Sequence, residues 1–316
     1  MPDRIRVAVD GRELELSNLD KVMYPAVGFT KGEVIDYYTR IAPILLPHIR
    51  ERALTRIRYP NGVDANGFFE KNAPAGTPDW VHTERLPAPG SGTGREELDY
   101  VVVDDLPTLV WLANLAALEL HTPQWRVVRH KPKAPDFMVV DLDPGPPAGL
   151  PECCAVALLM RERLAADGLT AFPKTSGKKG MQLMCAVAGR QSSDEVSAYA
   201  RRVAEELEHA EPKLIVSRMA KRLRPGKVFI DWSQNNAAKT TVSPYSLRAQ
   251  QVPTVSTPLT WDEVAAGDLV AAEFTASAVL ARVERLGDLM AGICEPGPRV
   301  PKRAAGSSTA HSRAAR

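Results

Sequence analysis

Two periods of hydrophobic spacing run along the chain, and together they predict both helices and strands. Thr30 and Glu33 fit a capping box, and apolar residues then recur every three or four positions, which predicts a helix over residues 31–48. Three further helices are expected over residues 106–120, 151–167 and 193–209. The first of these is mainly apolar and is therefore interpreted as a buried helix.

Strands are expected where short apolar runs end in turn-forming or polar residues. Residues 53–59 alternate in polarity and are followed by Asn61-Gly62, which is typical turn chemistry. Residues 137–140 are apolar without interruption up to Asp141, which is typical of a strand covered on both faces. Further strands are expected over residues 181–187 and 228–232. Strands that alternate with helices indicate a mixed α/β body.

Length and composition divide the chain into a body and a tail. With 316 residues and 44% hydrophobic content, residues 1–295 are expected to form one body with two lobes. Within it, residues 74–94 are rich in Pro, Gly, Ser and Thr, which predicts a loop-rich excursion. Residues 296–316 have little to bury and are expected to form a disordered basic tail.

Composition also argues against membrane and secreted classes. A bilayer span needs about 18–20 consecutive apolar residues, and even the run 106–120 contains Asn114 and Glu119. The N-terminal sequence lacks the apolar core of a secretory signal, and the four cysteines form no CxxC pair. These features favour a reducing cytoplasm and no membrane partner.

The net charge gives no general argument for a nucleic-acid partner. The tail carries five of the 40 basic residues and none of the 38 acidic ones, so the body is slightly acidic. A site for a polyanion must therefore come from local clustering of charge. One such cluster has six basic residues and no carboxylate between residues 212 and 230, although a solvated loop is the simpler interpretation.

Three aspartates at the ends of predicted strands form the first candidate site. Asp141 and Asp143 lie two apart, so on a strand both point to the same face, and Asp231 ends a neighbouring predicted strand. Adjacent carboxylates repel each other, and Mg²⁺ or Mn²⁺ accept carboxylate oxygens as ligands. We therefore hypothesise a site for two divalent cations. The alternative is that Asp143 and Asp231 only cap a turn and a strand end.

A loop with two glycines, two hydroxyls and two lysines supplies candidate phosphate contacts. It spans residues 175–180, between two predicted strands, and could bring backbone N–H groups and an ammonium onto a phosphate. Its spacing is not that of a Walker A motif. An exposed basic hairpin turn is the alternative.

Aromatic and histidine residues complete the candidate chemistry. Phe68 and Phe69 are consecutive, so on a strand they point to opposite faces, and an exposed ring beside Lys71 could stack on a nucleobase. A second core contact is the alternative. His121 is interpreted from the sequence alone as a packed or capping residue rather than a catalyst. Carboxylates, a phosphate-type loop and exposed aromatics together indicate a nucleotide and a nucleic acid as substrates.

The order of these motifs resembles the polymerase domain of bacterial ligase D, a member of the archaeo-eukaryotic primase superfamily used in non-homologous end joining. The resemblance covers residues 17–248 and extends to about residue 292. It is carried by SNLDKVMYP (17–25), TKGEVIDYY (30–38), FFEKN (68–72), LELHTPQW (118–125), VVDLDPG (139–145), KTSGKKG (174–180) and VFIDWSQNNAAKTTVSPYSLRA (228–249).

The resemblance implies a fold and a set of site residues. The fold is a two-lobed primase-like catalytic core with mixed sheets flanked by helices. The implied metal ligands are Asp141, Asp143 and Asp231. His121 matches an active-site histidine of the family, whereas the sequence alone favours a packed or capping residue. Implied nucleotide-binding positions are Ser176, Lys179, Gly180, Gln182, Gln234, Lys239 and Arg248. Implied DNA-binding positions are Asn18, Lys21 and Lys31 for a 5′-phosphate, Phe68 and Phe69 for the template, Lys71, and Arg224 for end alignment.

The resemblance also implies an activity and partners. The expected reaction is template-directed nucleotidyl transfer that fills short gaps and extends broken ends, with a preference for ribonucleotides. Expected cofactors are two divalent cations, Mn²⁺ or Mg²⁺. Expected partners are gapped or broken DNA with a 5′-phosphate, NTP or dNTP, the end-binding protein Ku and a separate ATP-dependent ligase. A bacterial cytoplasmic, nucleoid-associated location follows from these partners.

Two departures from the family pattern leave alternatives open. The family usually has histidine where this chain has Gln182, and glutamine cannot become cationic. Because a hydrogen bond to a charged group contributes roughly 1.5–3 kcal/mol, weaker nucleotide binding or slower turnover is expected. A DNA-end binding module with weak or lost catalysis is the main alternative, and a primase that starts chains without a primer is a third. Fused ligase and nuclease domains are absent from the sequence, so a stand-alone homologue is expected.

Overall fold

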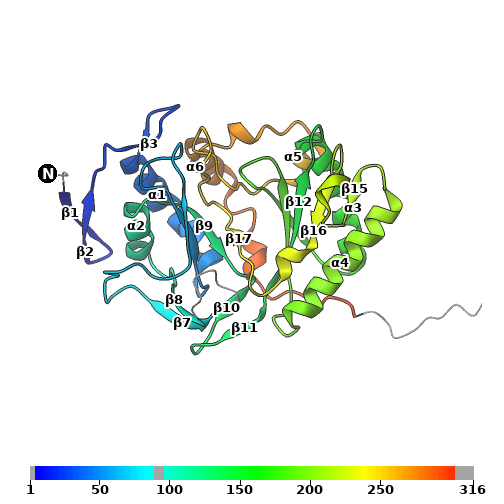
Figure 1. Ribbon diagram of the computed structural model, residues 1–316, viewed down its shortest axis with the longest axis horizontal. Coiled ribbons are helices and arrows are strands. Elements are labelled where there is room, and N and C mark those ends of the chain that lie inside the picture. The colour runs from blue at the N-terminus through cyan, green and yellow to red at the C-terminus, as the bar shows by residue number, and fades with distance from the viewer. Residues whose placement is uncertain (1–3, 89–95, 303–316) are drawn as a thin grey trace, which may run out of the picture.

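The computed structural model describes residues 4–88 and 96–302, which form two lobes that lie side by side (Figure 1). One lobe has a four-stranded sheet with strand order β17-β9-β5-β6. Its strands are β5 (Thr55–Arg58), β6 (Phe68–Glu70), β9 (Ala117–Thr122) and β17 (Thr241–Val242). Helices α1 (Lys31–Ile49) and α2 (Leu106–Asn114) pack beside it and share one hydrophobic core with it.

The other lobe has a five-stranded mixed sheet with strand order β13-β14-β12-β16-β15. Its strands are β12 (Phe137–Pro144), β13 (Ala171–Thr175), β14 (Met181–Ala186), β15 (Ile215–Val216) and β16 (Val228–Asp231). Helices α3 (Leu150–Ala166) and α4 (Ser193–Ala210) cover this sheet, and a second large core forms between them. The two cores explain why the chain folds as two lobes.

Smaller elements surround these sheets (Figure 1). Four two-stranded antiparallel pairs are β1 (Arg4–Val9) with β2 (Arg12–Ser17), β3 (Val22–Tyr24) with β4 (Phe29–Thr30), β7 (Thr83–Pro87) with β8 (Glu97–Val101), and β10 (Trp125–Val127) with β11 (Pro132–Pro135). Two further helices are α5 (Trp261–Ala266) and α6 (Ala276–Leu286). No helix within the described residues is long and apolar enough to cross a membrane.

The helix that opens the first lobe begins where its capping chemistry predicts. The Thr30 side chain accepts a hydrogen bond from the Glu33 N–H, and the Glu33 carboxylate accepts one from the Thr30 N–H, so α1 starts at Lys31. The phenol of Tyr38, on its buried face, donates to the Leu118 carbonyl at 2.6 Å. This bond ties α1 to β9, which carries several candidate site residues.

The prediction of one buried helix over residues 106–120 is wrong. The helix ends at Asn114, Ala116 turns the chain with a φ of 59°, and residues 117–122 form strand β9. Both β9 faces are covered, so its apolar residues do not alternate with polar ones. A fully buried strand and a buried helix therefore look alike in the sequence.

Two irregular segments are also more structured than predicted. Strand β7 lies within the expected loop 74–94, while residues 89–95 lie outside the described part. In the expected tail, Val300 is 3% exposed, and the Arg202 guanidinium donates to the Pro301 carbonyl at 3.0 Å. Residues 296–302 therefore pack on the second lobe, and the rest of the tail lies outside the described residues.

Candidate active site

The five-stranded sheet brings the three predicted aspartates together. Asp141 and Asp143 both lie on β12, and Asp141 is paired directly with Asp231 on β16 and with Gln182 on β14. Residues opposite each other on neighbouring strands project from the same face of a sheet. Three acids and one amide therefore share one face, which only the strand register determines.

Asp141 is a buried carboxylate whose negative charge is poorly compensated. Burial, followed by the repulsion from Asp143, raises its pKa to about 7. The Gln182 amide donates to Asp141 Oδ1 at 3.0 Å and partly offsets this shift. Such a group favours either a proton or a cation beside it.

Asp231 lies in the same cluster, but its oxygens are held by neighbouring polar groups. Its Oδ1 accepts hydrogen bonds from the Ser233 N–H at 3.0 Å and from the Ser233 hydroxyl. The Gln234 amide donates to Asp231 Oδ2 at 3.2 Å and to Asp141 Oδ2 at 3.5 Å. Lys239 Nζ lies 3.6 Å from Asp231 Oδ2. Gln234 thus connects the two carboxylates.

The donor set fits a hard divalent cation in its chemistry. It offers carboxylate oxygens on one face, with an unfavourable concentration of negative charge. As arranged here, no group of three or more His, Cys, Asp or Glu side chains within residues 4–88 and 96–302 is placed to hold a metal ion. Asp141 and Asp143 are the carboxylates that could hold a cation, because both line the cavity, whereas the oxygens of Asp231 are bonded to Ser233 and Gln234.

The turn between β13 and β14 forms the predicted phosphate-type loop. The Ser176 hydroxyl accepts from the N–H of Lys178 at 3.3 Å and of Gly180 at 3.2 Å. A Cβ at Gly180 would lie 2.4 Å from the Leu142 carbonyl oxygen, so only glycine fits there. Arg248 supports the loop from the other side, since its Nη1 donates to the Ser176 carbonyl at 2.8 Å. Hydrogen bonds to Ser176 therefore fix the conformation of the loop, and Gly180 packs it closely against β12.

Glu119 is a buried residue of this site that was not predicted. Its side chain is inaccessible, with His121 Nε2 at 3.1 Å, Arg248 Nε at 3.3 Å and Lys178 Nζ at 3.4 Å from its oxygens. Burial raises the pKa of Glu119, but the His121 bond and Arg248 outweigh it and lower the pKa to about 2. Glu119 is thus an anion that joins two candidate site residues, His121 and Arg248, to Lys178 of the phosphate-type loop.

His121 is uncharged at neutral pH in this environment. Burial lowers its pKa, with Arg248 acting in the same direction and Glu119 against it. Because a carboxylate only accepts hydrogen bonds, the contact with Glu119 places the ring proton on Nε2 and leaves a lone pair on Nδ1. From the sequence alone His121 is expected to be a packed residue, but it lines a cavity together with Asp141 and Asp143.

Lys174 is a second buried residue that was not predicted. It is fully buried on β13, and burial, followed by the charge of Arg248, lowers its pKa well below the usual range. Its Nζ donates to Gln182 Oε1 at 2.5 Å and to Ser256 Oγ at 2.7 Å. Gln182 in turn donates to Asp141, so Lys174 fixes which way the Gln182 amide points. The sequence signal for Glu119 and Lys174 is a charged residue inside an otherwise apolar strand.

A cavity of about 550 Å³ brings most of the predicted catalytic and nucleotide residues together. The predicted residues that line it are His121, Asp141, Asp143, Ser176, Lys179, Gln182, Gln234 and Arg248. Asp231, Gly180 and Lys239 do not line it. The cavity is thus lined by carboxylates together with hydroxyl, ammonium and guanidinium groups.

Two groups of predicted DNA-binding residues lie outside this cavity, both in the first lobe. Phe68 and Phe69 on the edge strand β6 are 53% and 60% exposed, so neither enters the core. Lys31 is buried, and burial and then the charge of Lys21 lower its pKa to about 8. Asn18 forms the turn before them, since its carbonyl accepts from the Lys21 N–H at 3.1 Å.

The two remaining DNA-binding candidates are held by nearby protein groups. Lys71 Nζ lies 3.5 Å from the Ala238 carbonyl oxygen. The Arg224 guanidinium lies 3.7 Å from the centre of the Phe229 ring, and its Nη2 donates to the Met219 carbonyl at 3.0 Å. Phe229 pairs with Asp143, so the Arg224 guanidinium packs against β16, the strand next to that of Asp141 and Asp143.

Comparison with known proteins decides the family of this chain. The family model described as "LigD, primase-polymerase domain" matches residues 30–290. The chain belongs to the LigD primase-polymerase family. The expected polymerase/primase type of nucleotidyltransferase is therefore confirmed. 

Relatives and a solved structure agree with this assignment. The chain is 44% identical over 289 residues to the multifunctional non-homologous end joining protein LigD of Mycolicibacterium smegmatis, covering 92% of this chain and 37% of the relative. It is 33% identical over 276 residues to the bifunctional LigD of Bacillus subtilis, covering 87% and 43%. The chain thus spans less than half the length of these relatives.

A solved structure of similar fold is the polymerase domain from Mycobacterium tuberculosis ligase D in complex with DNA. The two structures match with a TM-score of 0.85 and 41% identity, covering 90% of this chain and 99% of that chain. The expected mixed α/β fold of the ligase D polymerase domain is therefore confirmed.

Proposed function

We propose that this LigD-type domain carries out template-directed nucleotidyl transfer, filling short gaps and extending ends in the repair of broken DNA. The observation that carries the proposal is the cavity, which Asp141 and Asp143 line together with Ser176, Lys179 and Arg248, residues that can contact phosphates. The relatives named for non-homologous end joining and the solved complex with DNA support the nucleic-acid part. Ribonucleotide preference, Ku and a separate ligase belong to the same proposal.

Asp141 and Asp143, with Asp231 beside them, are the proposed holders of two divalent cations, Mn²⁺ or Mg²⁺. Bound there, divalent cations supply the charge that activates a 3′-hydroxyl and neutralises a triphosphate. Asp231 can take part only if its bonds to Ser233 and Gln234 rearrange. Gln182 and Lys174 keep Asp141 in place on the other side.

The other cavity residues bind and orient the nucleotide. Lys179 and the N–H groups of the loop 176–180 offer donors to phosphate oxygens, and Arg248 adds a fixed positive charge. Neutral His121 offers Nδ1 as an acceptor for a nucleotide hydroxyl. Phe68 and Phe69 offer exposed rings to the template, and Lys21 with Lys31 bind the 5′-phosphate across the gap.

A gapped-duplex assay tests this function. Incorporation of a ribonucleotide opposite a one-base gap with Mn²⁺ is expected for the wild type and should fall at least about 100-fold in Asp141→Ala, since electrostatic groups of this kind contribute about 10²–10³ in rate. Asp268→Ala, an exposed acid of the same lobe, is the matched control. DNA binding without incorporation would instead identify an end-binding module, and dinucleotide synthesis without primer would identify a de novo primase.

A further inference from the structure

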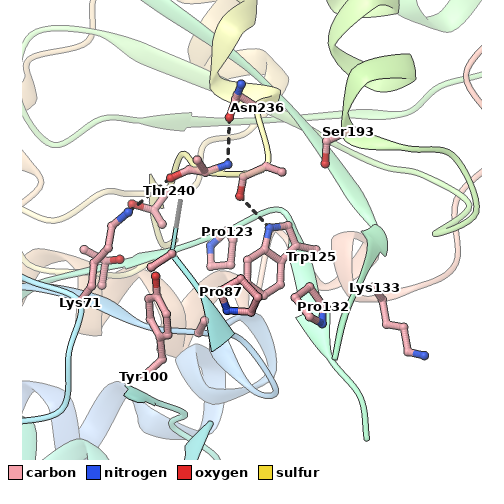
Figure 2. A pocket seen from close by; sticks show the side chains of 15 residues that line it. Lys71, Pro87, Tyr100, Pro123, Trp125, Pro132, Lys133, Ser193, Asn236 and Thr240 are labelled. Atoms are coloured by element: carbon pink, nitrogen blue, oxygen red, sulfur yellow. Dashed lines mark hydrogen bonds between the residues drawn. The ribbon is translucent and has the colours of Figure 1, made fainter. Parts of the chain in front are cut away.

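A second cavity lies beside the candidate active site, between the two lobes (Figure 2). Its volume is about 390 Å³, within the roughly 300–1,000 Å³ range of ligand pockets. Thr240 lines both cavities. Strand β9 connects them as well, because His121 lines the first cavity and Pro123, just after the strand, lines the second.

The wall of the second cavity is aromatic and apolar. Trp125 and Tyr100 supply the rings, and prolines flank Trp125 in Figure 2. Trp125 is positioned by its Nε1–H, which donates to the Ala237 carbonyl at 2.9 Å. The cavity therefore presents a preformed surface on which a flat, apolar ring can lie.

Two lysines give the cavity a positive rim. Lys71 and Lys133 both line it, and the described lining residues include no carboxylate. Lys133 is exposed and has no salt bridge to a described residue. Within residues 4–88 and 96–302, the Lys71 ammonium has one polar contact, a long one of 3.5 Å to the Ala238 carbonyl. The rim therefore has positive charge available for an anion.

The cavity also continues an exposed aromatic surface. Lys71 follows Phe68 and Phe69, whose rings are 53% and 60% exposed on the same edge of the sheet. A ligand that crosses this surface meets the exposed rings of Phe68 and Phe69, then Lys71, and then the cavity, where Trp125 lies between Lys71 and Lys133 in Figure 2. Stacked bases joined by phosphates have this alternation of flat apolar rings and negative charge.

We propose that this second cavity binds an unpaired nucleobase of single-stranded DNA next to the site of synthesis. The base lies against Trp125 and Tyr100, and its flanking phosphates lie at Lys71 and Lys133. The inference rests on the proposed function for its choice of DNA as the strand. It adds a holding point for an unpaired base outside the catalytic cavity.

Fluorescence anisotropy with labelled DNA, without nucleotide or metal, tests the proposal. Trp125→Leu is expected to weaken binding to a duplex with a five-base single-stranded overhang about 10-fold, since stacking contributes roughly 1–3 kcal/mol per base. Affinity for the blunt duplex should stay unchanged. Trp125→Phe is the matched control, because it keeps an aromatic ring but loses the bond to Ala237, and it should bind the overhang nearly as the wild type does.

A lysine pair gives a second, independent readout. Lys133→Ala should weaken overhang binding. It should also reduce the slope of the logarithm of the binding constant against the logarithm of the salt concentration by about 1. Lys131→Ala is the control, since Lys131 is equally exposed on the adjacent turn but does not line the cavity. Overhangs with a free 5′ end and with a free 3′ end are compared, and a Trp125 effect on either one supports the proposal.

The outcomes separate this proposal from the proposed function. If the wild-type protein binds neither the overhang nor the blunt duplex, the proposed function itself is contradicted. Wild-type binding and gap filling, with the same overhang affinity in Trp125→Leu, contradicts only the second cavity's role. Equal losses in Trp125→Leu and Trp125→Phe assign the effect to the Ala237 bond and overturn the proposal. Competition by a free nucleoside monophosphate that depends on Trp125 as strongly as overhang binding does would overturn the choice of a DNA strand.

Discussion

At the scale of single residues, the candidate site depends on buried ionisable residues that do not themselves line the cavity. Glu119 is inaccessible and holds His121, Arg248 and Lys178 by contacts of 3.1–3.4 Å. Lys174 is inaccessible as well; burial lowers its pKa well below the usual range, and its Nζ bonds the neutral amide of Gln182. Buried polar and charged groups are costly unless they have partners, so each contact fixes the orientation of both members. Their effect on the site is therefore through geometry.

Replacing Glu119 by glutamine tests this view. Glu119→Gln leaves Arg248 and Lys178 without their anion, so the free energy of unfolding should fall by roughly 3 kcal/mol. The KM for nucleotide should rise several-fold more than kcat falls, because Arg248 loses its fixed position. Denaturant unfolding and steady-state gap filling measure the two effects.

Glu263→Gln is the control for that variant. Glu263 is also a carboxylate that binds an arginine, Arg282, but it is only partly buried and lies at the start of α5, outside the cavity lining. It should lower stability and leave the nucleotide KM unchanged. An equal rise of KM in both variants would refute a specific role for Glu119.

A pH dependence follows from Lys31. Its pKa is lowered to about 8 by burial and by Lys21, so its charge is present below pH 8 and lost as the pH rises above it. The preference for a 5′-phosphorylated gap should therefore decrease between pH 7 and pH 9. The ratio of dissociation constants for phosphorylated and unphosphorylated gaps measures it. Lys31→Arg should flatten the profile, and a flat profile in the wild type contradicts the assignment.

At the scale of elements, the register of β12 with β14 and β16 creates the site. Asp141 faces Asp231 on one side and Gln182 on the other, and the turn between β13 and β14 folds back onto β12. Gly180 is the closest approach of that turn, since a Cβ there would lie 2.4 Å from the Leu142 carbonyl oxygen. The phosphate-type loop is thus positioned by strand packing and not by its own sequence alone.

Gly180→Ala should therefore displace the loop. The backbone of Leu142 cannot yield easily, so we expect a loss of about 1–3 kcal/mol in stability and weaker nucleotide binding. Thermal unfolding and nucleotide titration measure these changes. Gly149→Ala is the control, because its Cβ would find ordinary contacts at 3.7 Å or more. Unchanged nucleotide binding in Gly180→Ala would contradict the role given to the loop.

At the scale of the whole molecule, the cavity lies where the two lobes meet. The first lobe contributes His121 from β9 to its lining, and the second contributes Asp141, Asp143 and residues of the loop 176–180. Arg248 joins the lobes, because it contacts both Glu119 of β9 and Ser176 of the loop. The meeting of the two lobes therefore brings acidic and basic side chains around one cavity.

The repulsion between the clustered acids should lower the stability of the metal-free protein. The pKa of Asp141 is raised to about 7 in the folded protein, so stability falls as the pH rises from the ordinary aspartate pKa to about 7 and stays constant above it. Asp141→Asn removes this cost, and at pH 8 it should raise the melting temperature, with ~1 kcal/mol giving ~2–4 °C. At pH 5 the rise should be smaller than at pH 8, because Asp141 is ionised in the unfolded chain but still protonated in the folded protein.

Divalent cations should act on the same group. Mn²⁺ is expected to stabilise the wild type at pH 8 and to have little effect on Asp141→Asn, as measured by thermal unfolding. Glu211→Gln, a change of an exposed acid, should keep the wild-type response. The same Mn²⁺ response in the wild type and in Asp141→Asn would place the cation elsewhere.

The sequence by itself determined the elements with strong local signals. The capping box of α1, the amphipathic helix α4 and the apolar core of β12 follow from neighbouring residues, and so does the shared face of Asp141 and Asp143. The family motifs identified most lining residues of the cavity. Only the tertiary structure decided that β9 is a strand, that Asp231 pairs with Asp141, and that Glu119 joins His121 to Arg248. These depend on strand register and on burial between distant segments, which no local spacing encodes.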